Sequence, residues 1–137
     1  MDPILHLSIP VRDLAEARQF YLDALGCRPG RERPGWCDVW FYGLQLTLQE
    51  QPDQVLSGEQ RGVRHFGVTL SGDQLDQLVE RVSRHEVVWL VPVTVDYPGT
   101  PEEQRKAKIL DPSGNAIEIK AYADPDSALA GVGPPTP

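Results

Sequence analysis

The feature that most constrains this chain is an internal repeat of a strand-like segment. Residues 6–11, His-Leu-Ser-Ile-Pro-Val, can be laid over residues 65–70, His-Phe-Gly-Val-Thr-Leu, with polar positions in the same alternating phase. Each copy is followed by residues at helical spacing and then by further strand-like runs. The chain is therefore expected to fold as two modules with the same order of elements.

The patterns between these repeats predict β-α-β-β-β in each half. In the first module, about residues 3–50, Asp13 is a helix N-cap, Gly26 ends the helix, and strands are expected at 37–42 and 44–49. A polar linker runs to about residue 62. In the second module, about 62–122, a strand, an amphipathic helix, an apolar strand at 87–91 and a closing hairpin over residues 106–121 follow in the same order.

Length and charge narrow the classes of protein. A chain of 137 residues accommodates one compact domain, expected over residues 1–122, and a net charge of −7 disfavours nucleic-acid and anionic-membrane partners. The chain has no signal-peptide pattern and no stretch of membrane-spanning length, so a cytoplasmic location with free Cys27 and Cys37 thiols is expected. Residues 123–137, rich in Ala, Asp, Gly and Pro, are expected to form a flexible tail.

Most of the expected strands have one apolar face and one polar face. Two helices can cover the apolar face, and the other face is too polar for a packed core. The predicted fold is α+β, with the strands curled into a mixed sheet around a polar cavity and the helices outside. The polar positions are His6, Ser8, Gln45, Thr47, Gln49, His65, Thr69, Glu118 and Lys120.

Three of these residues are predicted to bind a metal ion. His6 and His65 occupy equivalent repeat positions, and Glu118 lies on the last strand of the second module. Two imidazoles and one carboxylate form the facial triad typical of non-haem iron, with coordination positions left open. A lone strand histidine is more often structural, and Glu118 could instead pair with Lys108 or Lys120. The repeat register of the two histidines favours the metal.

The motifs resemble those of the glyoxalase/bleomycin-resistance/extradiol-dioxygenase superfamily, also called the vicinal-oxygen-chelate superfamily. The resemblance lies in the opening His-Leu-Ser-Ile-Pro-Val-Arg-Asp-Leu, the helix end Phe-Tyr-Leu-Asp-Ala-Leu-Gly and the segment Asp-Pro-Ser-Gly-Asn-Ala-Ile-Glu, across residues 3–122. It implies a metal cavity, a small-molecule substrate and a homodimer. It does not fix the reaction, because one scaffold of this kind hosts many activities.

Departures from the subfamilies narrow the choice of reaction. Glyoxalase I-type isomerases carry a fourth, carboxylate ligand where this chain has Thr47, so glyoxalase activity is disfavoured. Fosfomycin-type thiol transferases have a potassium-binding loop that differs from residues 96–103 here. Extradiol dioxygenases have a Tyr where this chain has Lys108. Drug-sequestering bleomycin-type proteins generally lack the complete His-His-Glu set.

The sequence is therefore interpreted as that of a metal-dependent, dioxygenase-like enzyme whose small substrate chelates the metal through adjacent oxygens. Fe(II) or Mn(II) is favoured, with Zn(II) or Ni(II) as alternatives, and Lys108 or Tyr97 is expected to assist charge development. A lyase, isomerase or thiol transferase on the same metal, or a non-catalytic binding protein, is the alternative. The expected substrate-binding residues are Ser8, Trp40, Gln45, Thr47, Gln49 and Lys120.

Overall fold

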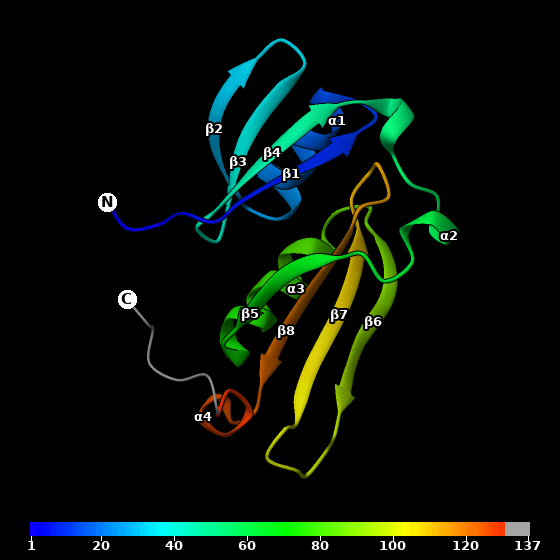
Figure 1. The fold of residues 1–137 in the computed structure, drawn as a ribbon. Coiled ribbons are helices and arrows are strands. Elements are labelled where there is room, and N and C mark those ends of the chain that lie inside the picture. The colour runs from blue at the N-terminus through cyan, green and yellow to red at the C-terminus, as the bar shows by residue number, and fades with distance from the viewer. Residues whose placement is uncertain (131–137) are drawn as a thin grey trace.

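A computed structural model describes residues 1–130 and shows two four-stranded mixed sheets (Figure 1). Sheet A has the order β1-β4-β3-β2 and sheet B the order β5-β8-β7-β6. The predicted α+β class and the two β-α-β-β-β modules are confirmed, but the sheets are not closed into a barrel. The strands are β1 His6–Val11, β2 Arg28–Arg33, β3 Trp36–Phe41, β4 Leu44–Glu50, β5 Phe66–Leu70, β6 Val88–Asp96, β7 Gln104–Leu110 and β8 Ala116–Tyr122.

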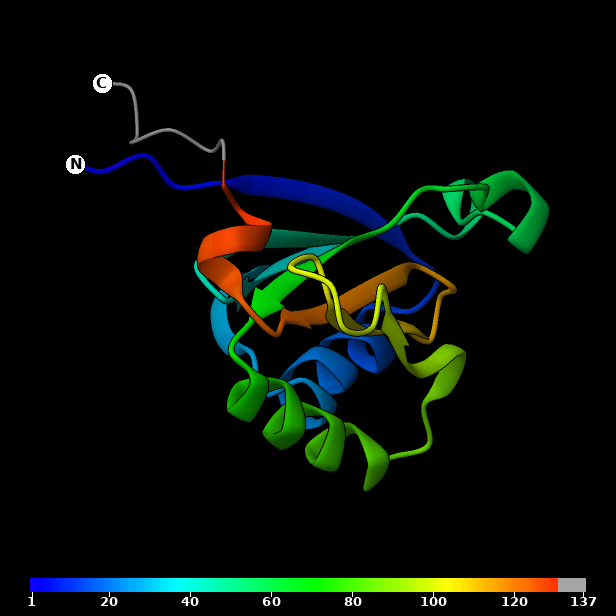
Figure 2. The same ribbon diagram turned by 90° about the horizontal axis from the view of Figure 1, so that it is seen from below.

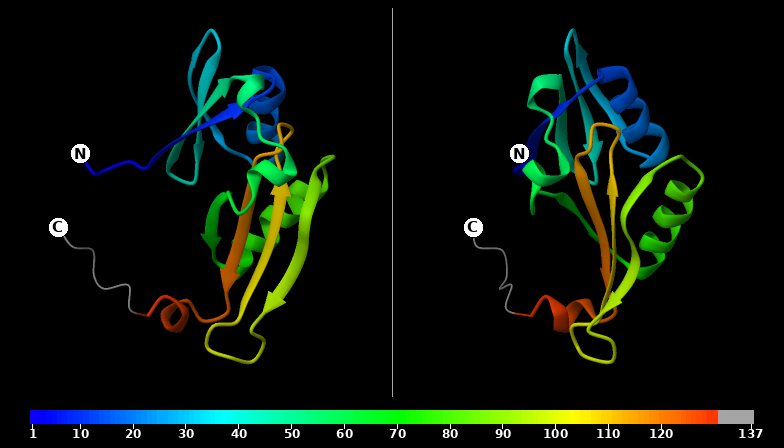
Figure 3. Two further views of the ribbon diagram at one scale, coloured as in Figure 1. Left: turned by 45° about the vertical axis from the view of Figure 1, so that its right-hand side comes forward. Right: turned by 90° about the vertical axis from the view of Figure 1, so that its right-hand side faces the viewer.

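Helices cover one side of both sheets. Figures 2 and 3 show α1 (Leu14–Gln19) and α3 (Gly72–Ser83) on the same side of the two sheets. The Asp13 side chain caps α1 by accepting from the Glu16 amide, as predicted. A π-helical turn, η1 (Phe20–Ala24), continues α1, and the chain then turns at Gly26 with φ of +73°.

The strand pairing matches between the modules. In each, the first strand runs parallel to the last, and the remaining neighbours are antiparallel. Ser8 lies opposite Thr47, and Gly67 lies opposite Glu118. The ladder therefore confirms that Thr47 occupies the place in sheet A that Glu118 occupies in sheet B.

The apolar core is continuous across the two modules. It lies between the helices and the inner faces of both sheets, because the apolar residues of each strand alternate with the polar ones. Both cysteines are free thiols: Cys37 is buried in this core, and burial raises the pKa of the half-buried Cys27 to about 12. The largest fully buried side chains include Tyr21, Phe41, Leu46, Leu48, Leu75, Ile109, Ile117 and Ile119.

A buried carboxylate fastens the β7–β8 turn to the first module. The Tyr21 hydroxyl donates to Oδ2 of Asp111 at 2.8 Å, and the amides of Ser113 and Asn115 donate to Oδ1, both at 2.9 Å. The Asn115 side-chain amide donates to the backbone oxygen of Pro10 at 3.0 Å. Burial raises the pKa of Asp111, although these donors act in the opposite direction.

Replacing Tyr21 with Phe should lower the free energy of unfolding by about 1–3 kcal/mol, because it leaves a buried carboxylate oxygen short of one donor. Urea denaturation followed by circular dichroism measures this change. Tyr42→Phe, at a half-exposed position, is the matched control and should have little effect. Equal midpoints for wild type and Tyr21→Phe would show that the bond contributes nothing to stability.

Three shorter helices are not part of the repeated β-α-β-β-β order. The segment between the modules carries η2 (Pro52–Gln54) and α2 (Gly58–Arg61), and α4 (Pro125–Ala128) follows β8. Thus the segment expected to be a flexible tail begins with a capped helix, while residues 131–137 lie outside the described residues. Among residues 1–130, no helix is long and apolar enough to cross a membrane.

Candidate functional site

The outer face of sheet B, opposite the helices, brings together most of the polar residues expected in the second module. Glu118 on β8 lies opposite Lys108 on β7 and Gly67 on β5, and Lys120 lies opposite Lys106 and Thr69. His65 immediately precedes β5 on the same face. A cavity of about 240 Å³ lies over this face, lined by His65, Phe66, Gly67, Val68, Thr69, Glu118 and Lys120.

His65 and Glu118 are in direct contact. Nε2 of His65 lies 3.1 Å from Oε2 of Glu118, and Nδ1 of the same ring lies 2.8 Å from the backbone oxygen of Val63. A neutral imidazole that donates its Nδ1 proton to Val63 turns the lone pair of Nε2 toward the carboxylate. A cation shared by the two groups would stabilise that arrangement.

The distance also fits a shared metal ion. Two ligand atoms about 2.1–2.2 Å from an ion, at right angles to each other, are about 3 Å apart. The 3.1 Å between Nε2 and Oε2 is therefore a suitable spacing for adjacent ligands. The bond from Nδ1 to a carbonyl is the outer contact that metal-binding histidines commonly make.

The close approach of β5 to β8 sets the position of this pair. A Cβ atom added to Gly67 would lie 1.8 Å from the backbone oxygen of Glu118. Only glycine therefore permits the observed spacing between the strands, and this spacing holds His65 beside Glu118.

The outer face of sheet A holds the polar residues of the first module. His6 lies opposite Gln45, and its Nδ1 is 3.1 Å from the Gln45 backbone oxygen, which leaves Nε2 available in the same way as for His65. The Gln49 amide donates to the Ser8 hydroxyl. By strand pairing, the residues on this face include His6, Ser8, Gln45, Thr47, Gln49, Trp36, Asp38 and Trp40, with Arg28 and Arg33 of β2 beside the two tryptophans.

Asp38 is a member of this face that the sequence patterns did not single out. It is only 2% exposed, and it accepts hydrogen bonds from the Thr47 hydroxyl at 2.6 Å and from Nε of Arg31 at 2.7 Å. Burial alone would raise the pKa of Asp38, but these two donors lower it. Because Asp38 lies opposite Thr47 as Lys108 lies opposite Glu118, the repeat register could have identified the position.

The three expected metal ligands do not converge within one chain. His6 is on sheet A, whereas His65 and Glu118 are on sheet B, and β1 and β5 each pair only with a strand of their own sheet. In the described part of the chain, no three His, Cys, Asp or Glu side chains lie close enough together to hold a metal ion. The expectation of a single-chain triad is therefore not met by this structure.

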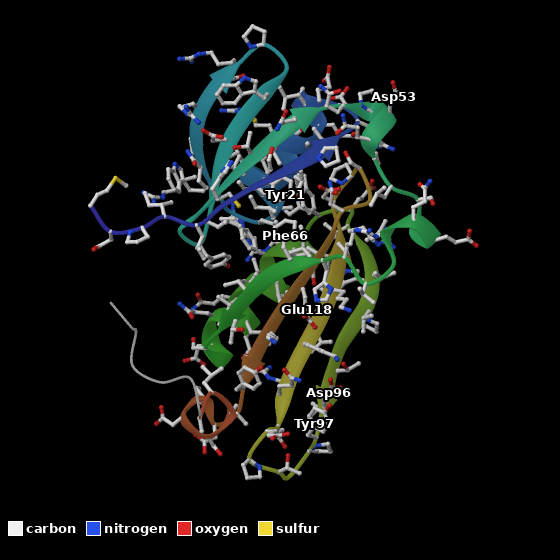
Figure 4. The ribbon with its side chains drawn as sticks, in the orientation of Figure 1. Tyr21, Asp53, Phe66, Asp96, Tyr97 and Glu118 are labelled. Atoms are coloured by element: carbon white, nitrogen blue, oxygen red, sulfur yellow. The ribbon has the colours of Figure 1, made fainter. Side chains whose placement is uncertain are left out.

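The two residues expected to assist catalysis lie at different distances from the His65–Glu118 pair. Lys108 is directly opposite Glu118, on the same face. Tyr97, 58% exposed, lies beyond the Asp96–Gln104 pair at the far end of sheet B, roughly 13 Å along β7 from Lys108. Figure 4 shows Tyr97 and the neighbouring Asp96 at the far end of sheet B, well away from Glu118, and Phe66 at the junction of the modules.

An apolar cleft adjoins His65 at the junction of the two modules. Its volume is about 390 Å³, and Leu7, Ile9, Leu56 and Phe66 contribute to its walls. The cleft offers space for the apolar part of a small molecule next to the imidazole.

Comparisons with known proteins agree with this architecture. The family described as "Glyoxalase/Bleomycin resistance protein/Dioxygenase superfamily" matches residues 3–119. No match was found among curated proteins.

Several solved structures share the fold. A glyoxalase/bleomycin resistance protein/dioxygenase from Alicyclobacillus acidocaldarius is 31% identical, with a TM-score of 0.82 over 92% of this chain and 96% of that one. The fosfomycin resistance protein FosX from Listeria monocytogenes is 16% identical, with a TM-score of 0.75 over 94% of this chain and 99% of that one. A mutant of FosX, crystallised with Mn(II) and 1S,2S-dihydroxypropylphosphonic acid, is 17% identical, with a TM-score of 0.71 over 97% and 99%.

Proposed function

Because the chain belongs to the glyoxalase/bleomycin resistance protein/dioxygenase superfamily, we propose that it is a metal-dependent enzyme acting on a small substrate that chelates the metal through adjacent oxygens. The observation that carries this proposal is the His65–Glu118 pair, whose 3.1 Å spacing and outer bond to Val63 suit two adjacent ligands. Many members of this superfamily are metalloenzymes.

Fe(II) or Mn(II) is the favoured ion, and Zn(II) or Ni(II) is the alternative. The imidazole and carboxylate ligands suit all of these ions, and FosX was crystallised with Mn(II). When bound, such an ion supplies Lewis acidity and a template for the substrate oxygens. His65 and Glu118 would hold it through Nε2 and Oε2, and the contact of His65 Nδ1 with the Val63 carbonyl would orient the ring on sheet B.

The third ligand is proposed to be His6 of a second copy of the chain. The outer faces of sheets A and B are both open and polar, and each carries one part of the triad. A homodimer that lays sheet A of one copy over sheet B of the other would bring His6 to His65 and Glu118. By symmetry it would form two equal sites, each closed from solvent.

Substrate contacts then come from both sheets. Sheet A supplies Ser8, Trp40, Gln45, Thr47 and Gln49, and sheet B supplies Lys108 and Lys120. Lys108, opposite Glu118, is placed to donate to a substrate oxygen as negative charge develops. Tyr97 is a weaker choice for that role because of its distance along the sheet.

A dioxygenase-like reaction is proposed first because a three-ligand site leaves coordination positions for both substrate oxygens and a further reactant. Thr47 brings a neutral hydroxyl, which donates its proton to Asp38, where a fourth ligand would need a carboxylate. Metal analysis of protein purified without chelator tests this choice. Iron with substrate-dependent oxygen uptake would support it, and stoichiometric zinc or nickel without oxygen uptake would overturn it.

A proton-transfer reaction, as in an isomerase or lyase, is the second proposal. The specific observation is that the Asp38 carboxylate lies 2.6 Å from the Thr47 hydroxyl, beside the position where the isomerases have their fourth ligand. Asp38→Asn keeps the shape of the side chain and removes its basicity. If this variant keeps its metal content but no longer incorporates solvent deuterium into the product, a proton-transfer reaction is favoured.

The two-copy site predicts complementation between two inactive variants. His6→Ala and Glu118→Ala should each bind no metal tightly, because every site in either homodimer lacks one ligand. After the two are unfolded, mixed in equal amounts and refolded, a mixed dimer has one complete site, so metal content should reach about one quarter of the wild-type value per chain. Refolding each variant alone is the control. No recovery on mixing would refute the proposed sharing of ligands.

A further inference from the structure

The lysines of this chain are confined to one place. The sequence has ten arginines spread along its length but only three lysines, Lys106, Lys108 and Lys120. All three lie on the outer face of sheet B, where Lys108 is opposite Glu118 and Lys106 is opposite Lys120. None of the helices or strands of the first module carries a lysine.

Two of these lysines form no ion pair with a carboxylate in the described part of the chain. Nζ of Lys106 lies 2.6 Å from Oδ2 of Asp96, an ion pair that raises the pKa of Lys106. Within residues 1–130, Lys108 and Lys120 form no ion pair with a carboxylate, and Nζ of Lys120 lies 5.4 Å from the centre of the Tyr122 ring. Glu118, the nearest carboxylate across the ladder, is already engaged by His65.

The face is therefore positive within a negative protein. Its three lysines exceed the two carboxylates, Asp96 and Glu118, while the chain as a whole carries a net charge of −7. A bound divalent ion would add to this local excess. Such a local reversal of sign concentrates anions at the face.

The positions of Lys108 and Lys120 on the ladder allow both side chains to reach a single ligand. Lys108 and Lys120 are diagonal neighbours across the β7–β8 ladder, a relationship in which backbones are about 7–8 Å apart and long side chains can reach a common group. Both flank Glu118, so a group held by them lies next to the proposed metal.

We propose that Lys108 and Lys120 form an oxyanion subsite, so that the substrate carries a negatively charged carboxylate, phosphate or phosphonate group in addition to the oxygens that chelate the metal. This inference adds the class of substrate to the proposed function. It rests on the proposed function only for the position of the metal. Both lysines of the subsite lie on sheet B of the same chain.

Selective labelling tests the subsite directly, because ¹³C-lysine gives only three Cε signals in the full-length protein. The metal-free protein is titrated with inorganic phosphate, and in parallel with acetate, at fixed ionic strength. Saturable shifts of Lys108 and Lys120, larger than that of Lys106, are expected. Lys108→Met and Lys120→Met should each weaken phosphate binding about tenfold or more. A stronger response to acetate than to phosphate would assign the subsite to carboxylates.

The matched control is Arg84→Met, which removes one positive charge from the end of α3, away from this face, and should change phosphate affinity by less than about twofold. Equal, non-saturating shifts of all three lysines, or an equal loss in Arg84→Met, would overturn the subsite. Metal binding is measured separately on the same samples. Phosphate binding without metal binding would refute the metal site alone, and metal binding without phosphate binding would refute the subsite alone.

Discussion

Glu118→Gln is expected to lower divalent-metal affinity by more than about 100-fold, because loss of outer contacts alone costs 10- to 100-fold and this change removes a charged ligand. The amide is nearly the same size as the carboxylate, so the fold should be preserved. The side chain would still face Nε2 of His65 at the same place in the cavity. Titration with Mn(II), followed by electron paramagnetic resonance of the free ion, measures the affinity.

Asp96→Asn provides the control for this change, since Asp96 is a carboxylate of the same sheet that pairs with Lys106 rather than with a histidine. Its metal affinity should remain near that of wild type. If Glu118→Gln retained full affinity, or Asp96→Asn lost as much, Glu118 would not be a ligand.

The second large effect is expected from Gly67→Ala. The new Cβ would lie 1.8 Å from the backbone oxygen of Glu118, so β5 and β8 must separate by well over an ångström. The backbone cannot yield as a flexible side chain can, and a loss of about 3 kcal/mol or more in the free energy of unfolding is expected. Chemical denaturation measures the loss, and metal affinity should fall with it because His65 moves away from Glu118.

Gly58→Ala is the matched substitution for Gly67→Ala. An added Cβ at Gly58 would meet only the end of the Arg61 side chain, at 3.9 Å. Stability within about 0.5 kcal/mol of wild type is expected there. A Gly67→Ala protein as stable as Gly58→Ala would mean that the two strands can separate without cost.

The sequence predicted the elements whose residues alternate clearly between core and solvent. Strand β8 is an example, because Ile117, Ile119 and Ala121 are buried while Glu118 and Lys120 are partly exposed. Strand β2 was missed, although the expected β-α-β-β-β order required it. All six of its residues are exposed, and its pairing with β3 is interrupted by a register shift, so no periodic pattern marks it.

The candidate site was predictable in part because its residues also alternate with apolar ones along their strands. Repeat register placed His6 and His65 on equivalent faces, and the strand pairing agrees. Register fixes the face of a sheet, but it carries no information about which sheets come to face each other, so it could not predict that His6 lies on a different sheet from His65 and Glu118. Asp38 was missed because its burial depends on Arg31, which reaches it from β2.

The two histidines differ in what supports their rings. His6 is bonded to the Gln45 carbonyl on β4, inside a sheet, whereas His65 is bonded to the Val63 carbonyl, in a residue that is 90% exposed and belongs to the connection between the modules. Local opening of that connection would free the His65 ring without breaking any strand pairing. Metal exchange is therefore expected to proceed through release of His65, and its rate should follow amide hydrogen exchange in the connection rather than global unfolding.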